Sequence, residues 1–509
     1  MHALLITRSA VVLWAVALAA PVRAQRPVAA APAGGPLVIE HVTVVDVERG
    51  LLQADRRVVV AGTRIAAVDS GTAARPAGAR RVDGRGKFLI PGLWDMHVHT
   101  FRNRMDAPGQ NTDDSDVFFP AFLANGVTGV RDMSTDLADH VQIRRWADAR
   151  AAGALAAPRL VGGSPLLGGV PPIQRNALSV GTAADARRVV DSLVDGGVGF
   201  LKVYSGLSRE AYFAIAAQAK RRGVPFAGHV PGSVTHAEAS DAGQRSFEHM
   251  NDAPRNCSAD MWAADVRVAA IRRDTSVSRD SAAALARAAT LALLARFDVR
   301  DCAPVLARFA RNRTWQVPTL TVNRLAYARA DSATRADPRL RFVSPRLLAE
   351  WEATGSLAGY GQPLSAAERA IELARYRVRE RLLAAMHEAG VPILAGTDVH
   401  NPYVYPGFSL HDELALLVEA GLPPLAALRA ATLDPARFLG ATDSLGTVAP
   451  GKLADLVLLD ADPLQDIHNT TRIRAVVLNG RYLDRAALDA LLADAERVAR
   501  LPEQRRPRR

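Results

Sequence analysis

Phe88–His99 reads FLIPGLWDMHVH, an apolar segment of strand length that ends on two histidines. His97 and His99 are two residues apart, and side chains at that spacing on a strand point to the same face. Two imidazoles on one face are suited to holding a single metal ion. The chain contains 12 histidines in 509 residues, which gives about 0.3 such pairs by chance, so the pair alone is weak evidence.

Segments of similar length recur along the middle of the chain, separated by alanine-rich stretches with helical character. Parallel strands connected by helices are the expected result, and eight strands are enough to close a (β/α)8 barrel of the TIM type. Two longer Ala/Arg-rich stretches, 252–314 and 321–391, are expected to be helical insertions over the mouth of the barrel. The seven segments that follow the opening one read GVTGVRD, RLVGGS, FLKVYS, PFAGHV, SFEHM, WQVPTL and PILAGTD.

Both ends of the chain are rich in strands. Residues 37–90 contain LVIEHVTVVD and RRVVVAGTRIAAVD, and residues 444–485 contain GTVAPGKLADLVLL and IRAVVLNGRYL. Short apolar runs punctuated by glycine turns are typical of a sheet. We therefore expect one small β-sandwich domain, built from both terminal segments, beside a barrel domain over 91–443, with a basic C-terminal tail over 486–509.

The first 24 residues have the pattern of a signal peptide. Arg8 precedes the apolar run Ala10–Ala20, and Val22–Ala24 resembles a cleavage site. The run is too short to span a bilayer, which needs about 20 residues. We expect no membrane span, cleavage after Ala24, a linker over 25–36, and a periplasmic or secreted protein.

Cys257 and Cys302 are the two cysteines of the chain. They are either two buried thiols or a disulfide, and export from the cytoplasm favours the disulfide.

The charge balance bears on the partners. The formal net charge is +11, but the sequence has no basic helix, zinc-finger spacing or basic-aromatic motif, which argues against nucleic-acid binding. A small-molecule substrate is the expected partner, and a homo-oligomer is compatible with the composition.

Four further polar residues end other predicted strands: Lys202, His229, His249 and Asp398. Each has an ordinary interpretation when taken alone. The lysine could extend to the rim or pair with a carboxylate, the histidines could pack in the core, and the aspartate could cap a helix. Together with the histidine pair, however, they all fall at the carboxyl ends of strands, where barrel enzymes build their active sites.

These motifs identify a resemblance to the amidohydrolase superfamily, particularly to its prolidase-like branch with two metal ions. It extends over nearly the whole mature chain, and imidazolonepropionase is a related member. The motifs that carry it are IPGLWDMHVH, LKVYSG, GHV, FEHM, AGTD and GTVAPGKLADLVLLD.

The resemblance implies a particular set of metal ligands. Lys202 would be N-carboxylated and would bridge two divalent ions, expected to be zinc. One ion would take His97, His99 and Asp398, and the other His229 and His249. Asp398 would also be the catalytic base, passing a proton from the attacking water to the leaving amine.

The resemblance further implies hydrolysis of an amide or peptide bond in a dipeptide, an Xaa-Pro-like substrate or an N-acyl amino acid by a metal-bridged hydroxide. The alternatives are a one-metal enzyme that opens a cyclic amide or deaminates a heterocycle, and an inactive metal-binding protein. The sequence departs from several prolidase-like relatives at Ser205–Ser208, where they have a glycine pair, and this weakens inference about the substrate.

Four other residues are weaker candidates. Tyr204 is either a ligand for a substrate carboxylate or oxyanion, or a packed tyrosine. His140 could also bind a carboxylate, although a solvated helix face is the ordinary interpretation. His411 is expected near the start of a helix, and Arg131 is expected to form a structural ion pair with the neighbouring aspartate.

Overall fold

The computed structural model describes residues 35–70, 76–103, 111–174, 177–250, 254–328, 331–352 and 364–502. The predicted signal peptide and almost all of the predicted linker lie outside these residues. Within them, no helix is both long enough and apolar enough to cross a bilayer.

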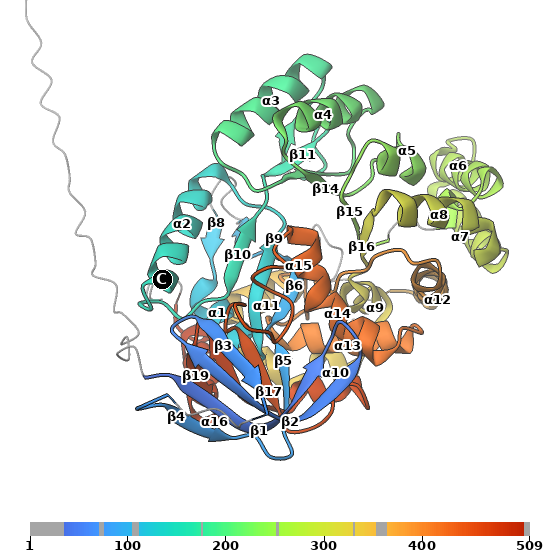
Figure 1. The fold of residues 1–509 in the computed structure, drawn as a ribbon. Coiled ribbons are helices and arrows are strands. Elements are labelled where there is room, and N and C mark those ends of the chain that lie inside the picture. Colours follow the sequence, from blue (N-terminus) through green and yellow to red (C-terminus); the bar gives the residue numbers. More distant parts are fainter. Residues whose placement is uncertain are drawn as a thin grey trace, which may run out of the picture.

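Strands from the two ends of the chain form one eight-stranded sheet, in the order β19-β18-β17-β5-β1-β2-β3 with β4 paired to β1 (Figure 1). Its apolar face buries Ile39, Val58, Leu89 and Leu456 in a core of its own. The terminal segments therefore join in a common sheet, while a two-layered sandwich stays a prediction. The strands are β1 (Leu37–Asp46), β2 (Leu51–Ala61), β3 (Arg64–Asp69), β4 (Arg80–Asp83), β5 (Phe88–Pro91), β17 (Leu456–Leu459), β18 (Ile473–Leu478) and β19 (Arg481–Asp484).

The segment Phe88–His99 divides into two strands, not one. β5 pairs with β1 and β17 in the terminal sheet, whereas β6 (Leu93–Val98) pairs in parallel with β9 (Val127–Asp132). The break falls at Gly92, where a Cβ would lie 2.1 Å from the Thr128 hydroxyl oxygen. Only glycine allows the chain to pass so close while it leaves one sheet for the other.

The middle of the chain is α/β with parallel strands, as predicted. One sheet has the order β10-β9-β6 and another β12-β11-β13-β14-β15-β16. Seven of the eight predicted strands are present. The strands not yet given are β10 (Arg159–Gly162), β11 (Leu166–Gly168), β12 (Leu178–Ser179), β13 (Leu201–Val203), β14 (Phe226–Gly228), β15 (Ser246–Glu248) and β16 (Trp315–Val317), with a separate hairpin of β7 (Phe101–Asn103) and β8 (Asn111–Asp113).

The eighth predicted strand, PILAGTD, is extended but irregular. It contacts its neighbours through two isolated parallel bridges, Gln316 with Ile393 and Val98 with Val399. Asp398 has a positive φ of 59°, which a regular strand does not tolerate. The segment is therefore bridged on both sides without forming a continuous ladder.

Helices follow most of these strands and cover the parallel sheets (Figure 1). They are α1 (Ser115–Ala124), α2 (Leu137–Ala151), α3 (Ala183–Asp195), α4 (Arg209–Arg222), α5 (His236–Asp241), α6 (Ala259–Arg273), α7 (Arg279–Ala295), α8 (Ala303–Asn312), α9 (Leu320–Ala328), α10 (Ser332–Arg335), α11 (Pro345–Glu352), α12 (Ala366–Glu388), α13 (Phe408–Glu419), α14 (Pro424–Ala430), α15 (Leu433–Leu439) and α16 (Arg485–Ala499).

The two stretches predicted as insertions are helical where the structure describes them. α6, α7 and α8 project to one side of the molecule (Figure 1). Cys257 and Cys302 are bonded to each other, which confirms the predicted disulfide and ties the segment before α6 to the start of α8.

The predicted C-terminal tail needs a correction. Its first part is helix α16, which buries Leu488, Ala495 and Val498 and packs against α1. The apolar residues of this segment recur at helical spacing, and the excess of arginine masked that pattern. Residues 503–509 lie outside the described residues.

Candidate metal centre

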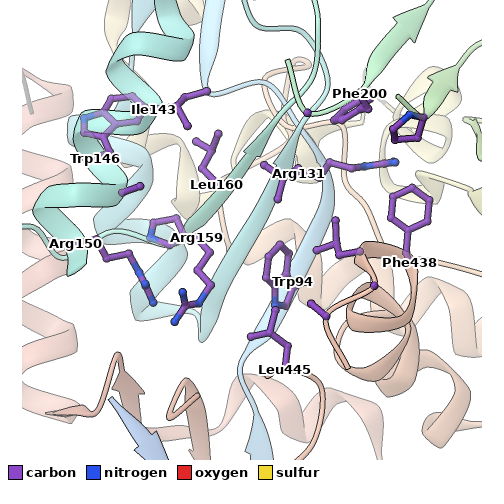
Figure 2. Close-up of a pocket in the computed structure, with 18 of the residues that line it drawn as sticks. Trp94, Arg131, Ile143, Trp146, Arg150, Arg159, Leu160, Phe200, Phe438 and Leu445 are labelled. Atoms are coloured by element: carbon purple, nitrogen blue, oxygen red, sulfur yellow. The ribbon is translucent and has the colours of Figure 1, made fainter. Parts of the chain in front are cut away.

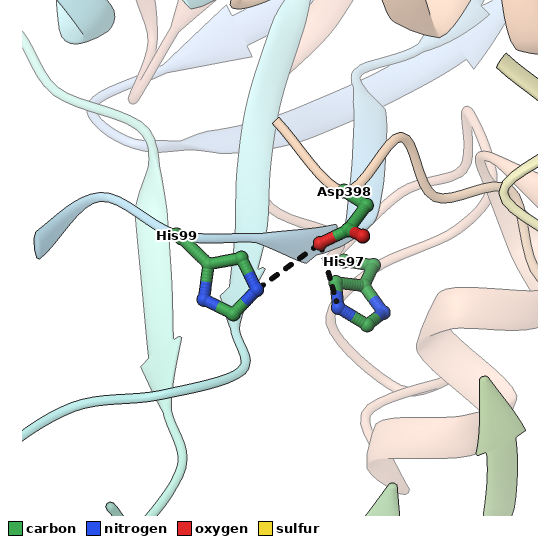
Figure 3. A group of neighbouring side chains, drawn as sticks. All are labelled: His97, His99 and Asp398. Atoms are coloured by element: carbon green, nitrogen blue, oxygen red, sulfur yellow. Dashed lines mark ion pairs between the residues drawn. The ribbon is translucent and has the colours of Figure 1, made fainter. Parts of the chain in front are cut away.

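Three of the predicted ligands form a compact cluster at the carboxyl end of β6. One ligand atom each from His97, His99 and Asp398 lies within 4.8 Å of the others. Asp398 Oδ1 is 3.2 Å from His97 Nε2 and 3.1 Å from His99 Nε2 (Figure 3). Two imidazoles and a carboxylate directed at one point are a donor set that zinc and related ions prefer.

The backbone around Asp398 is tightly packed at Gly396 and strained at Asp398 itself. A Cβ at Gly396 would lie 2.6 Å from Val317 Cγ1 and 2.9 Å from the backbone nitrogen of His97. His249 has a positive φ of 70°, as Asp398 has one of 59°. Such backbone conformations cost free energy and collect at functional sites.

The imidazole of His97 is held by a carboxylate behind it. Its Nδ1 lies 2.8 Å from Glu248 Oε2, and both side chains are fully buried. Its Nε2 is buried and has no hydrogen-bond partner among the described residues. A histidine fixed by a carboxylate on one nitrogen and unsatisfied on the other is the arrangement of a metal ligand, so the residues present fit a divalent cation.

Glu248 is in turn held by Arg131, which is fully buried. The guanidinium donates to both Glu248 oxygens at 3.1 and 3.2 Å and to the Met96 carbonyl at 2.6 Å. Burial alone would raise the pKa of Glu248, but Arg131 and His97 hold that pKa far below its usual range. The predicted pairing of Arg131 with Asp132 is wrong, because Asp132 instead accepts the backbone N–H groups of Thr100 and Ser134.

Asp398 is charged in this setting. Burial opposes its ionisation, but the nearby imidazoles of His97, His249 and His99 lower its pKa well below the usual range. His249 Nδ1 lies 3.6 Å from Asp398 Oδ2 and 2.9 Å from the Thr319 hydroxyl.

The remaining predicted ligands border this cluster. The ring of His249 lies 4.7 Å from that of His97 and 4.8 Å from that of His229, measured between centroids. His229 Nδ1 is 3.0 Å from the Ser205 hydroxyl, so the serine at the atypical Ser205–Ser208 segment orients a histidine. Burial lowers the pKa of His229 well below its usual range, and that of His249 to about 3.

Lys202 lies on β13 beside β14, and only 1% of it is exposed. Burial lowers its pKa to about 8, against the opposing effect of Glu248 and Asp398. No carboxylate lies within ion-pairing distance of its ammonium among the described residues. A buried lysine without such a partner is costly in its charged form.

Of the two weaker catalytic candidates, only Tyr204 lies at this cluster. Its ring is 4.3 Å from that of His229, and its hydroxyl accepts a hydrogen bond from Gln174 at 3.3 Å. His140 is buried in α2 with Nε2 2.9 Å from the Gly163 carbonyl, so this nitrogen already has a backbone partner. His411 contacts Thr470 and the Asn125 carbonyl.

Two buried acids in this region were missed by the sequence reasoning. Glu248 directly precedes His249 in FEHM, and a carboxylate inside a buried strand was the available signal. Asp95 accepts hydrogen bonds from Thr397 and from the His97 backbone, and burial raises its pKa to about 7. It fastens the Asp398 segment to β6.

Comparisons with known proteins agree with this geometry. The model of the Amidohydrolase family matches residues 88–314 and 346–483. An adenine deaminase of Methanothrix thermoacetophila is 30% identical over 126 residues, which are 25% of this chain and 20% of that protein. An imidazolonepropionase of Shouchella clausii is 31% identical over 125 residues, 24% of this chain and 28% of that protein. The matched segments thus span only 20% and 28% of the length of these two curated relatives.

Solved structures match over most of their length. A bottromycin amidohydrolase is 26% identical with a TM-score of 0.68, covering 92% of this chain and 91% of that one. A Xaa-Pro dipeptidase with bound methionine is 18% identical with a TM-score of 0.59, covering 88% and 100%; at that identity it supports the fold alone.

Proposed function

This chain belongs to the amidohydrolase family, as its motifs predicted, and from that premise we propose that it is an exported hydrolase that cleaves an amide or peptide C–N bond in a small substrate. Membership places it among hydrolases of carbon–nitrogen bonds. The dipeptide, Xaa-Pro-like or N-acyl amino acid substrate is the finer proposal. Supporting it are the likeness to the bottromycin amidohydrolase over 92% of the chain and the position of Tyr204 beside His229, where its hydroxyl could bind a substrate carboxylate.

The architecture is proposed to be a closed (β/α)8 barrel over 91–443 beside the terminal domain. The bridges of the irregular eighth segment to β16 and to β6 support closure, and so does the hydrogen bond from Ser164 to the Phe200 carbonyl between neighbouring strands. Closure would bring all the strand ends that carry the predicted ligands to one mouth.

The centre is proposed to hold two divalent ions. His97, His99 and Asp398 would hold one, His229 and His249 the other, and a carboxylated Lys202 would span both. Bound ions would lower the pKa of a water molecule and polarise the scissile carbonyl. The observation that carries the proposal is the burial of Lys202 near His229 and His249 without an ion-pair partner among the described residues, because carboxylation removes the unpaired cation.

The protein's own residues supply the other functions. Glu248 fixes the orientation of His97, and Ser205 and Thr319 do the same for His229 and His249. The carboxylate of Asp398 is ionised and can accept a proton from the attacking water and donate it to the leaving nitrogen. Tyr204 is placed to hydrogen-bond the substrate beside His229.

One observation favours a second candidate, a one-metal enzyme acting on a cyclic amide or a heterocyclic amine. Only the trio of His97, His99 and Asp398 meets the distance expected of a common ion among the described residues. The matches to an adenine deaminase and an imidazolonepropionase point in the same direction.

Metal analysis and a substrate panel separate the two candidates. Metal-reconstituted protein should contain two ions per chain and hydrolyse members of a dipeptide and N-acyl amino acid panel. Lys202→Ala should lose the second ion and most of the activity, whereas Lys220→Ala, on the exposed face of α4, should keep both. One ion per chain, an active Lys202→Ala variant and turnover of heterocycles would support the second candidate instead.

A role for Asp398 in proton transfer has its own test. Asp398→Asn should lower kcat by about 10²–10⁴-fold when the variant is compared at equal metal content. A metal-loaded variant with unchanged kcat would contradict the proposed role.

Export is proposed on the signal-like pattern of the first 24 residues and the disulfide in the insertion. Sequencing the amino terminus of protein recovered from the periplasm or the medium should begin at Gln25, and intact protein retained in the cytoplasm would contradict this.

A further inference from the structure

A cavity lies away from the histidine cluster, at the opposite end of the parallel strands. Its volume is about 740 Å³, within the range of small-molecule sites. Trp94, at the start of β6, lines it (Figure 2), whereas none of the proposed metal ligands does. Five residues separate Trp94 from His99, a distance of about 16 Å along an extended chain.

The walls of this cavity combine apolar surface with positive charge. Two indole rings and three phenyl rings line it, together with branched aliphatic side chains. Every charged residue among the described lining residues is an arginine, and none is a carboxylate. The aromatic residues and arginines are Trp94, Phe119, Trp146, Phe200, Phe438, Arg131, Arg150, Arg159 and Arg245.

The positive charges are only partly compensated. Arg150 and Arg159 share one carboxylate, that of Asp455, at 3.1 and 2.8 Å. Arg131 is paired with Glu248. Arg245 has no carboxylate partner among the described residues, and its guanidinium donates to the Phe438 carbonyl.

The ring of Phe438 lies between two of these cations. The guanidinium carbons of Arg131 and Arg245 are each 4.9 Å from its centroid. Burial lowers the pKa of Arg245, Arg313 and Arg131 also disfavour its charged form, and a bound anion would offset that repulsion. Arg245 is also solvent-exposed, so its guanidinium is accessible to a ligand.

We propose that this cavity binds a small organic anion, a carboxylate attached to an aromatic or branched apolar body. The apolar body would lie against Trp94, Trp146 and Leu160, and the carboxylate would pair with Arg245. Apolar walls with a few converging charged groups are the usual composition of a small-molecule site, and an arginine fork fits a carboxylate in two-point contact. None of the proposed metal ligands lines the cavity, although Arg131 lines it and also pairs with Glu248 behind His97.

The test is calorimetric titration of the metal-loaded full chain with 3-phenylpropionate and with its neutral amide. The anion should bind at one cavity site per chain about tenfold more tightly than the amide. Arg245→Met should weaken the anion about tenfold and leave the amide unchanged, which corresponds to about 1.4 kcal/mol. Arg311→Met removes the same charge from an exposed position on α8 outside the cavity and should change neither.

A third variant separates this cavity from the metal centre, where a carboxylate could also bind. Ala147 lines the cavity and is exposed, so Ala147→Trp can fill the space without disturbing the core. It should abolish binding to the cavity. Equal affinity for acid and amide, equal effects of Arg245→Met and Arg311→Met, or binding that survives Ala147→Trp would overturn the proposal, as would no binding at about 10 mM ligand.

Discussion

Glu248 is the residue whose removal best tests how the metal centre is held. Its carboxylate lies between the guanidinium of Arg131 and Nδ1 of His97, and all three side chains are fully buried. Glu248→Gln keeps the shape but removes the charge. Arg131 would then be a buried cation without its carboxylate, and His97 would lose the acceptor that orients its ring.

Two effects of different kind are expected from this substitution. Breaking one side of a buried ion pair costs about 3 kcal/mol or more in the free energy of unfolding. Loss of the carboxylate behind a ligating histidine costs about 10–100-fold in metal affinity. Urea unfolding measures the first effect, and competition for zinc against a chelator of known affinity measures the second.

Glu413 provides a matched control, because it is also a fully buried carboxylate. It accepts hydrogen bonds from the backbone N–H groups of Leu320 and Thr321 at 2.8 and 2.7 Å and so holds the start of α9. Glu413→Gln should destabilise the fold by about 1–3 kcal/mol with little change in zinc affinity. The reasoning is refuted if Glu248→Gln binds zinc as wild type does, or if both variants lose the same affinity.

Three further predictions concern stability. Replacing Cys257 and Cys302 together by serine should lower the free energy of unfolding by about 4 kcal/mol in the chain-entropy model, since the bond closes a separation of 45 residues; equal unfolding of the oxidised protein and the double variant would contradict it. Gly396→Ala should cost about 1–3 kcal/mol because of the contacts with Val317 and His97, and thermal melting at wild-type Tm would show that the neighbours give way freely. Burial lowers the pKa of His411 to about 4. Between about pH 6.5 and 4 the unfolded chain therefore binds a proton at this histidine more readily than the folded chain does. As the pH falls through that window, the free energy of unfolding should decrease by about 1.4 kcal/mol per pH unit. The difference between wild type and His411→Gln in urea unfolding should therefore depend on pH there, and a constant difference would refute it.

The clustering of the candidate ligands could be predicted because strand ends in a parallel sheet meet at one edge. His97 and His99 were visible from their spacing, and Asp398 from its place after an apolar segment. The positive φ of Asp398 was not visible, because it depends on Gly396 passing close to β6 and on Asp95 fastening the neighbouring Thr397. These are contacts between residues about 300 positions apart, which no local pattern records.

The domain boundary was predicted at residues 90 and 91, next to Gly92, but the segment across it was still taken as a single strand. FLIPGLWDMHVH has the composition of one buried strand, and a single glycine is tolerated within a strand. What divides it is the approach of Thr128, a residue on another strand. Periodicity therefore identified the apolar segments, but which strand each segment pairs with depends on contacts between residues far apart in the sequence.

Arg131 shows why charge pairing is harder to infer than ligand position. Its nearest acid in sequence, Asp132, points to the opposite face of β9 and accepts backbone N–H groups there. The acid that Arg131 contacts comes from β15, 117 residues away. The Arg131–Glu248 pair matters to function because the cation keeps the Glu248 carboxylate charged. That carboxylate holds Nδ1 of His97, so that Nε2 of the same ring is directed at Asp398. The orientation of His97 thus depends on Glu248 and Arg131, two residues that no metal-binding motif contains. Substitution of either should lower the metal affinity even where the shape of the site is kept.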